Sequence, residues 1–176
     1  MSRKNKSAEF INDCIADALL QLMEEKPIEK ITAQEITDLA GVGRATFFRH
    51  FRSKDEILTY KLIRLWNQWV IDHNLSPEDH FSLSNTEDLL AFNLSIRPLI
   101  CKIYSAGMQH SIYMAFYQVM EPYFNFEPFH NYTSKFYAYG VFALLDEWIK
   151  RDFAETPKQI ADIVVHQIVG KDVPVT

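Results

Sequence analysis

Apolar positions recur at helical spacing along most of the chain and predict helices rather than strands. In residues 7–25, apolar side chains recur every three or four positions and form one stripe. The stripe comprises Phe10, Ile11, Cys14, Ile15, Ala18, Leu19, Leu22 and Met23. Pro27 ends this helix. With only five glycines among 176 residues and no sustained apolar–polar alternation, the pattern predicts an all-α fold.

The next segment carries signals for the start and end of a helix. Thr32 is a suitable N-cap, and Glu35, three residues later, completes a capping box. Ile36 and Leu39 are expected to face inward from this helix. Gly41 then breaks it.

A third, short helix is predicted at residues 44–51, with Phe47 and Phe51 buried. Ser53 and Glu56 form a second capping box, which opens a long helix extending past Trp69. A helix, a turn containing glycine and a short helix together form a helix-turn-helix unit. Further helices are predicted at residues 86–94, 98–106, 111–123, 133–153 and 157–169, the last capped by Thr156.

Charge is distributed unevenly along the chain. The net charge of −5 argues by itself against a nucleic-acid partner. Residues 1–61 nevertheless carry ten Lys/Arg and ten Asp/Glu, so the remainder supplies the whole negative excess. Residues 44–54 hold four cationic side chains and a histidine without one carboxylate. This segment is therefore predicted to lie against a nucleic-acid backbone.

The short helix at 44–51 has suitable chemistry for the major groove of DNA. The first turn of such a helix reaches base edges, where Arg44 suits guanine O6 and N7 and Ala45 suits a thymine methyl. The side chains at four-residue spacing, Thr46, His50 and Lys54, share a face and are expected to hold phosphates. Thr32 and Gln34 are expected on the opposite strand of the groove. The alternative is an ordinary solvated charged face.

The segment resembles the amino-terminal DNA-binding domain of the TetR/AcrR family of transcriptional regulators. The matching positions are Thr32, Ile36, Ala40, Gly41, Val42, Arg44, Thr46, Phe47, Arg49, His50, Phe51, Ser53 and Lys54. The resemblance adds Gly43, Phe48 and Arg49 to the expected DNA-binding residues. Gly43 stands where serine is common, and Phe48 stands where a tyrosine hydroxyl typically meets a phosphate, so both departures predict weaker phosphate contacts.

The resemblance implies a TetR-like architecture of about nine helices. It places a helix-turn-helix DNA-binding domain at residues 1–55 and a helical effector-binding and dimerisation domain at 56–176. It also implies a repressor released from a palindromic operator by a small molecule. Because the predicted fourth helix runs from the DNA-binding unit into the aromatic middle of the chain, we hypothesise that the effector acts by tilting this helix. The alternative is a relative with weakened or lost DNA binding that acts as a ligand-sensing coactivator or interaction module.

The last two predicted helices are apolar on more than one side. These positions are Phe136, Tyr139, Gly140, Ala143, Leu144 and Trp148, then Ile160, Ile163, Val164, Val165, Ile168 and Val169. The family resemblance implies a homodimer through these helices, and paired half-sites on DNA also require a symmetric dimer. The alternative is that both helices are central in a monomer core.

Aromatic and sulfur-containing residues in the middle of the chain are candidates for an effector pocket, although such residues are more often core. The candidates are Trp66, Trp69, Cys101, Tyr104, Met108, Tyr113, Phe116 and Tyr117. The scattered histidines lack metal-ligand spacing, and no catalytic motif is found, so neither a metal, a cofactor nor an enzyme is expected. Without a membrane-spanning or signal segment, the protein is expected in the cytoplasm.

Overall fold

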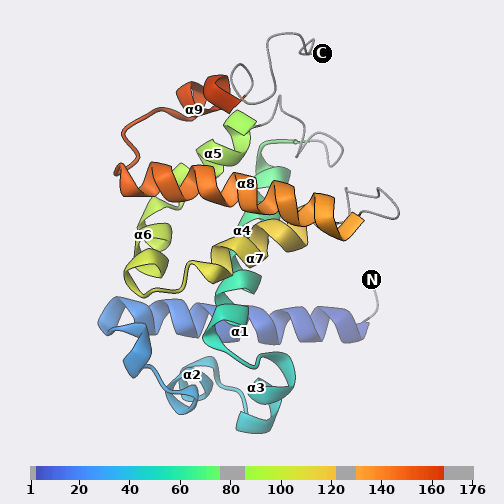
Figure 1. Ribbon diagram of the computed structural model, residues 1–176. Coiled ribbons are helices and arrows are strands. Elements are labelled where there is room, and N and C mark those ends of the chain that lie inside the picture. Colours follow the sequence, from blue (N-terminus) through green and yellow to red (C-terminus); the bar gives the residue numbers. More distant parts are fainter. Residues whose placement is uncertain (1–2, 76–85, 122–129, 165–176) are drawn as a thin grey trace. The chain divides into compact units, whose positions relative to one another are not determined.

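The computed structural model describes residues 3–75, 86–121 and 130–164, and the regular elements in these ranges are helices (Figure 1). In chain order they are α1 (Arg3–Glu25), the 3₁₀ helix η1 (Ile28–Lys30), α2 (Ala33–Ala40), α3 (Arg44–His50), α4 (Lys54–Asp72), α5 (Thr86–Ser95), α6 (Arg97–Ser105), α7 (His110–Met120), α8 (His130–Lys150) and α9 (Pro157–Ile163). The described ranges contain no strand, so the predicted all-α fold is confirmed.

Helix ends follow local chemistry. Helix α8 ends at Lys150, three residues before the predicted end, because Asp152 and Phe153 both adopt a φ of 56° and cannot continue a right-handed helix. Helix α9 begins as predicted, with Thr156 as N-cap and Pro157 as the first helical residue. The predicted continuation of α9 through residues 165–169 lies outside the described residues.

The chain divides into two compact units. One comprises Met1–Arg64 and Lys102–Ala115, and the other comprises Leu65–Cys101 and Phe116–Thr176. In the first unit, α1 packs on α2 and α2 packs on α3. Its largest fully buried side chains are mainly aliphatic and include Ile15, Leu19, Ile31, Ile36, Ile57, Leu58, Ile103 and Ile112. In the second unit, α5 packs on α9, and Trp148 of α8 is 1% exposed.

Two apolar residues of the first unit were wrongly predicted to face inward. Phe10 is 68% exposed because it lies nine positions before the buried Leu19, two and a half turns of helix away, and therefore on the opposite side of α1. Leu39 is 44% exposed, and the side of α2 next to Ile36 is filled instead by Thr37. Thr37 can be buried because its hydroxyl donates to the Gln34 carbonyl (2.8 Å).

Candidate nucleic-acid interface

Helix α2 is fixed at both ends by its own sequence. The predicted capping box is confirmed: Thr32 Oγ1 accepts from the Glu35 amide (3.2 Å), and the Glu35 carboxylate accepts from the Thr32 amide (2.9 Å). At the other end Gly41 has a φ of 66°, a left-handed conformation that glycine adopts without strain. The Val42 amide then donates to the Thr37 carbonyl (3.0 Å). The turn that leads into α3 therefore has a defined start.

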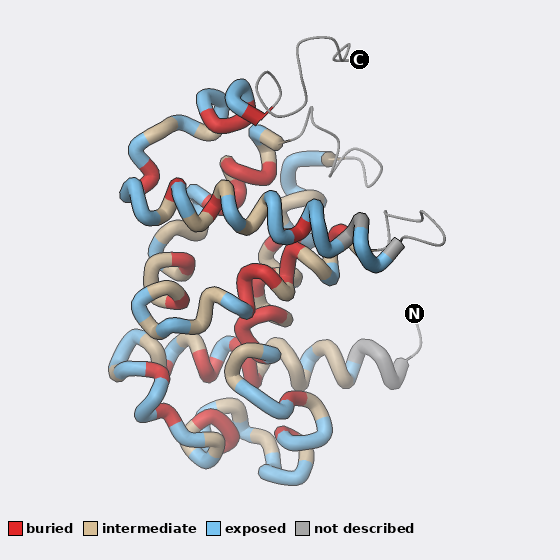
Figure 2. The backbone as a smooth tube through the Cα atoms, viewed as in Figure 1, coloured by how far each residue is buried: buried red, intermediate tan, exposed pale blue. Residues whose placement is uncertain are grey.

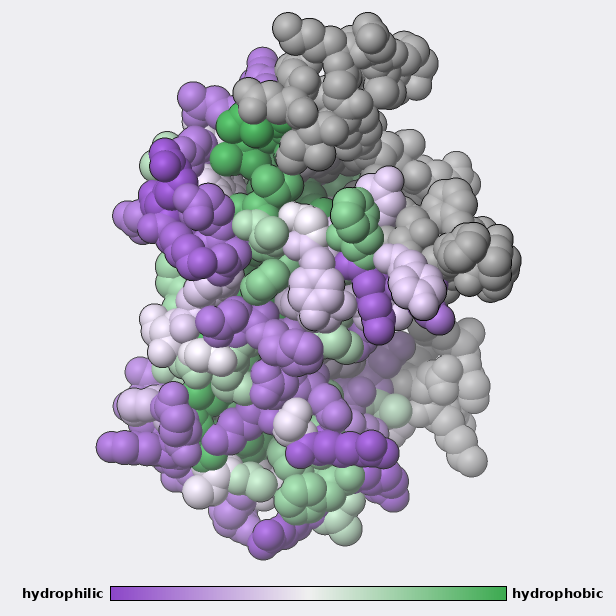
Figure 3. Space-filling model, viewed as in Figure 1, coloured by the Kyte–Doolittle hydropathy of each residue, from purple (hydrophilic) through white to green (hydrophobic). Residues whose placement is uncertain are grey.

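Helix α3 buries one side and exposes the other, as its sequence predicts. Phe47 and the following Phe51 are each 4% exposed, whereas Arg44, Ala45 and Arg49 are exposed. In Figure 2, short buried stretches interrupt the exposed and half-buried backbone of α2 and α3. In the view of Figure 3, the surface over these helices mixes hydrophilic and hydrophobic residues. Helix α3 is thus anchored by aromatic rings and carries cations on its outer side.

The two exposed arginines of α3 have different surroundings. The Arg44 guanidinium lies over the Phe48 ring, with Cζ 5.6 Å from the ring centroid. Arg49 instead donates to the Thr46 hydroxyl (3.3 Å). No carboxylate lies in the first turn of α3, and among the described residues none forms an ion pair with Arg44. The hydrogen-bond donors of Arg44 can therefore reach a ligand.

Two of the expected phosphate-binding residues bond to the protein itself. His50 Nδ1 donates to the Asn12 side-chain oxygen on α1 (2.6 Å), and Lys54 Nζ donates to the Ile28 carbonyl on η1 (2.5 Å). Both side chains are half-buried. Lysine has three N–H groups, so Lys54 can hold Ile28 and still donate to a phosphate.

The start of α2, where an anion was expected to bind, already holds a carboxylate. Thr32 Oγ1 donates to Glu35 Oε2 (3.0 Å), and Lys26 forms an ion pair with Glu35. The bond from Lys26, followed by those from Thr32, lowers the pKa of Glu35 to about 2, so its charge persists at neutral pH. Gln34, one turn before Asp38, donates to that carboxylate (2.7 Å). A phosphate contact from the Thr32 hydroxyl would require it to give up its bond to Glu35, whereas Gln34 keeps a second N–H that can still donate.

Gly43 lies between α2 and α3 in an extended conformation. As N-cap of α3 it has φ −72° and ψ 148°, and no side-chain oxygen caps the helix. A Cβ atom built on Gly43 would meet nothing within 4 Å. Neither backbone strain nor crowding therefore requires glycine at this position.

The second predicted capping box, at the start of α4, has an altered partner. The Glu56 amide donates to Ser53 Oγ (3.2 Å) as expected. The Glu56 carboxylate, however, accepts from the Arg52 amide (2.7 Å) rather than from Ser53. Both bonds still satisfy backbone N–H groups at the start of α4, one just before the helix and one in its first turn.

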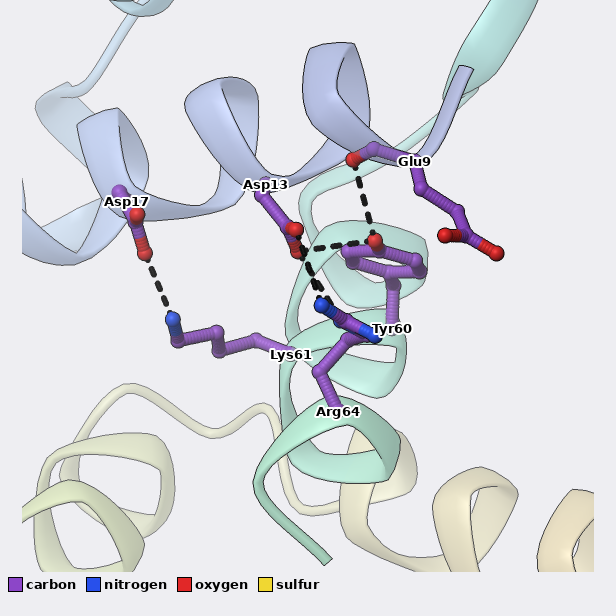
Figure 4. Close-up of polar contacts among 6 residues, drawn as sticks. All are labelled: Glu9, Asp13, Asp17, Tyr60, Lys61 and Arg64. Atoms are coloured by element: carbon purple, nitrogen blue, oxygen red, sulfur yellow. Dashed lines mark hydrogen bonds and ion pairs between the residues drawn. The ribbon is translucent and has the colours of Figure 1, made fainter. Parts of the chain in front are cut away.

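A polar cluster joins α4 to α1, and sequence reasoning did not find it (Figure 4). Asp13 accepts from the Tyr60 hydroxyl (2.9 Å) and from Nε and an Nη of Arg64 (3.1 Å each). One turn further along α1, Asp17 accepts from Lys61 (2.6 Å). Burial and the bond to Asp13 raise the pKa of Tyr60. The sequence signal for this cluster was the four-residue spacing of Asp13 and Asp17 on α1. It was not sufficient, because the partners of these two acids are more than forty residues away along the chain.

The effector candidates are distributed over both compact units. Tyr104, Met108 and Tyr113 belong to the first unit, and Trp66, Trp69, Cys101, Phe116 and Tyr117 belong to the second. In the second unit, Trp66 and Trp69 both make edge contacts with Phe92 of α5 (ring centroids 5.1 and 5.9 Å apart). The Trp69 ring also stacks on His73 at 3.7 Å. Trp69 Nε1 is buried, and no described group accepts a hydrogen bond from it.

The predicted dimer positions differ in exposure. On α8, Phe136 and Tyr139 are 74% and 55% exposed, and Gly140 and Ala143 are exposed too. Trp148 is a core residue instead, because its indole N–H donates to the Glu155 carbonyl (2.8 Å) within the unit. Of the remaining predicted positions, Leu144 is half-buried, Ile160 and Val164 are buried, and Ile163 is 40% exposed. Val165, Ile168 and Val169 lie outside the described residues.

In the described parts of the chain, no group of three or more His, Cys, Asp and Glu side chains is arranged to hold a metal ion. None of the helices described is both long enough and apolar enough to cross a membrane.

Comparisons with known proteins agree with this geometry. Residues 15–60 match the family of bacterial regulatory proteins of the tetR type, and residues 82–170 match a transcriptional regulator C-terminal region. An HTH-type transcriptional regulator, SAB2452, of Staphylococcus aureus (strain bovine RF122 / ET3-1) is 26% identical over 104 residues. That alignment spans 56% of this chain and 56% of the relative, about half the length of each. The first match covers the helix-turn-helix and the second covers half of the chain, so the protein belongs to the TetR family of transcriptional regulators.

Proposed function

We propose that the protein binds a palindromic operator in double-stranded DNA as a homodimer, and represses transcription until a small-molecule effector releases it. The observation that carries this proposal is the outer side of α3, where Arg44 and Arg49 are exposed and form no ion pair with a carboxylate of the described residues, while the buried Phe47 anchors the helix. A helix of this kind fits the major groove. In the proposal, residues 1–55 bind DNA and residues 56–176 bind the effector and the second protomer.

Within the interface, Arg44 and Ala45 are proposed to read bases, and Thr46 and Arg49 to contact the backbone. Lys54 contacts a phosphate while it holds Ile28. Because His50 Nδ1 already donates to Asn12, Nε2 donates to a phosphate only in the imidazolium form, in which both ring nitrogens carry a proton. Thr32, Gln34, Gly43 and Phe48 complete the contact surface.

Selection of bound sequences from random duplex DNA tests the proposal. We expect a palindromic consensus, with two half-sites about one helical turn apart. Affinity for that duplex is expected to fall by about 10³-fold or more between 50 and 200 mM salt, because phosphate neutralisation releases counterions. Arg44→Ala is expected to weaken binding and relax the preference at one base pair of each half-site, by about 1–3 kcal/mol. Selection of no sequence would refute operator binding.

The α8 surface supports the homodimer. Tyr132, Phe136, Tyr139 and Ala143 recur at spacings of four and three residues, and all are exposed. An apolar stripe at this spacing is typical of a helix with a partner. Phe136→Glu is therefore expected to yield monomers in sedimentation equilibrium. The matched control is Ile71→Glu on α4, because Ile71 is comparably exposed (67%) but lies outside the stripe; it is expected to leave the dimer intact.

The aromatic cluster around Trp69 supports an effector site. A buried indole N–H without an acceptor costs about 1–3 kcal/mol, which a ligand with a hydrogen-bond acceptor would recover. Amphipathic aromatic compounds that carry a carbonyl or carboxylate are thus the first to test, by displacement of labelled operator. Trp69→Phe is expected to weaken the response to an active compound. Unchanged operator affinity at saturation with a bound compound would refute release by that compound.

Some features of the candidate interface also fit a second function, in which DNA binding is weakened. His50 is engaged by Asn12, Gly43 supplies no cap, and Phe48 has no hydroxyl. These features favour a ligand-sensing coactivator or interaction module with weakened DNA binding. The salt titration separates the two functions, because an interaction module would not lose duplex affinity steeply with salt.

A further inference from the structure

The outer side of α3 contains an aromatic contact that the proposed DNA contacts do not explain. Arg44 and Phe48 are four residues apart, so both lie on one side of the helix. Helical side chains lean toward the N-terminus, which brings the Phe48 ring under the guanidinium. The separation of 5.6 Å between Cζ and the ring centroid lies within the range of a cation–π contact.

The Phe48 ring is itself held in place by the core. Although Phe48 is 50% exposed, its ring meets the Phe47 ring edge to face, with centroids 5.2 Å apart and planes at 90°. Phe47 is 4% exposed. The contacts therefore run from a buried ring through an exposed ring to the guanidinium of Arg44.

Such a contact restricts an arginine without consuming its hydrogen bonds. A guanidinium attracts a ring through its flat face, whereas its five N–H groups lie in its plane and remain able to donate. Guanine recognition needs two of these donors, aimed together at O6 and N7. A side chain that already has a restricted orientation loses less conformational freedom on binding.

We propose that Phe48 is a positioning residue that orients Arg44 for base reading and so contributes to sequence specificity. This inference rests on the proposed function, in which Arg44 contacts a base. It differs from a role for Phe48 against the sugar-phosphate backbone, which would act equally on all sequences.

The test compares affinities of the full-length protein for the selected duplex and for duplexes with single base pairs changed. The positions at which Arg44→Ala abolishes the preference define those that Arg44 reads. Phe48→Leu, which removes the π face, is expected to reduce discrimination at these positions by about two- to five-fold, corresponding to about 0.5–1 kcal/mol. Discrimination at the other positions and the salt slope are expected to stay unchanged.

Three controls make the test specific. Phe48→Tyr keeps the ring and is expected to retain discrimination. Phe10→Leu makes the same change at an exposed phenylalanine of α1 and is expected to have no effect. In an Arg44→Ala background, Phe48→Leu is expected to cause no further loss of discrimination.

The inference and the proposed function fail in different ways. If Phe48→Leu leaves discrimination unchanged, or weakens all duplexes equally, the positioning role is overturned while operator binding stands. If the wild-type protein selects no sequence, the proposed function itself fails. Thermal unfolding of each variant checks that the fold is retained.

Discussion

Gly43 offers a direct test of how the α3 helix begins. The residue is the N-cap of α3, yet it supplies no oxygen to the backbone N–H groups of the first turn. Its φ of −72° is accessible to any residue, and a Cβ would meet nothing within 4 Å. Gly43→Ser can therefore be accommodated without displacing a neighbour, and its hydroxyl can accept from the Ala45 or Thr46 amide.

Two effects set the magnitude of the stabilisation expected from Gly43→Ser. Replacing glycine at a compatible position reduces the entropy of the unfolded chain and stabilises the protein by about 0.4–1 kcal/mol. Serine is a better N-cap than glycine by a few tenths of a kcal/mol. We expect Gly43→Ser to raise the free energy of unfolding by about 1 kcal/mol and the Tm by about 2–4 °C.

Gly43→Ala separates the two effects. Alanine shares the entropic gain but offers no cap oxygen, and serine exceeds alanine at an N-cap by about 1 kcal/mol. Urea unfolding of the three proteins, followed by circular dichroism, measures the difference, with equal m-values required for the comparison. Equal stability of the serine and alanine variants would refute the reasoning. In the proposed function, the serine hydroxyl can also donate a hydrogen bond to a DNA phosphate. Gly43→Ser is therefore expected to bind the selected duplex more tightly than Gly43→Ala.

Three further predictions concern the elements that support the interface. Gly41→Ala is expected to lower the free energy of unfolding by about 1–2 kcal/mol, because alanine is strained at a φ of 66°; a smaller loss for Gly41→Asn in urea unfolding would support this cause. The pKa of Glu35 lies at about 2, below its ordinary value of 4.5, so its stabilising contribution is complete above pH 4.5 and is lost as the pH falls toward 2. Thermal melts across this range are expected to show a shallower pH dependence for Glu35→Gln, and an unchanged profile would contradict the assignment. Tyr60→Phe removes a hydrogen bond to the Asp13 carboxylate and is expected to cost about 1.5 kcal/mol in urea unfolding, whereas no loss would mean that Arg64 alone satisfies Asp13.

Local interactions made much of the helix-turn-helix predictable. The capping box of Thr32 and Glu35 and the left-handed turn at Gly41 depend on residues within a few positions of one another, so their spacing in the sequence is sufficient. The burial of Phe47 and Phe51 follows equally from four-residue spacing on a helix.

The same reasoning failed where a helix had more than one plausible buried side. The apolar stripe of α1 was assigned too widely, and Phe10 was included although it lies opposite the packed side. On α2 a threonine, Thr37, satisfies its hydroxyl locally and takes the buried place that hydrophobicity assigned to Leu39. Which side of a helix is buried depends on the elements packed against it.

The sequence alone thus determined the helical class, the helix ends near the interface and the concentration of cations on α3. Only the tertiary structure decided what those cations contact. His50 meets Asn12, and Lys54 meets Ile28, across 38 and 26 residues of chain. The physical reason is the sequence separation of the interacting groups. A cap or a turn is completed by neighbours in the sequence, whereas the partner of a long polar side chain is fixed only when separate helices pack together.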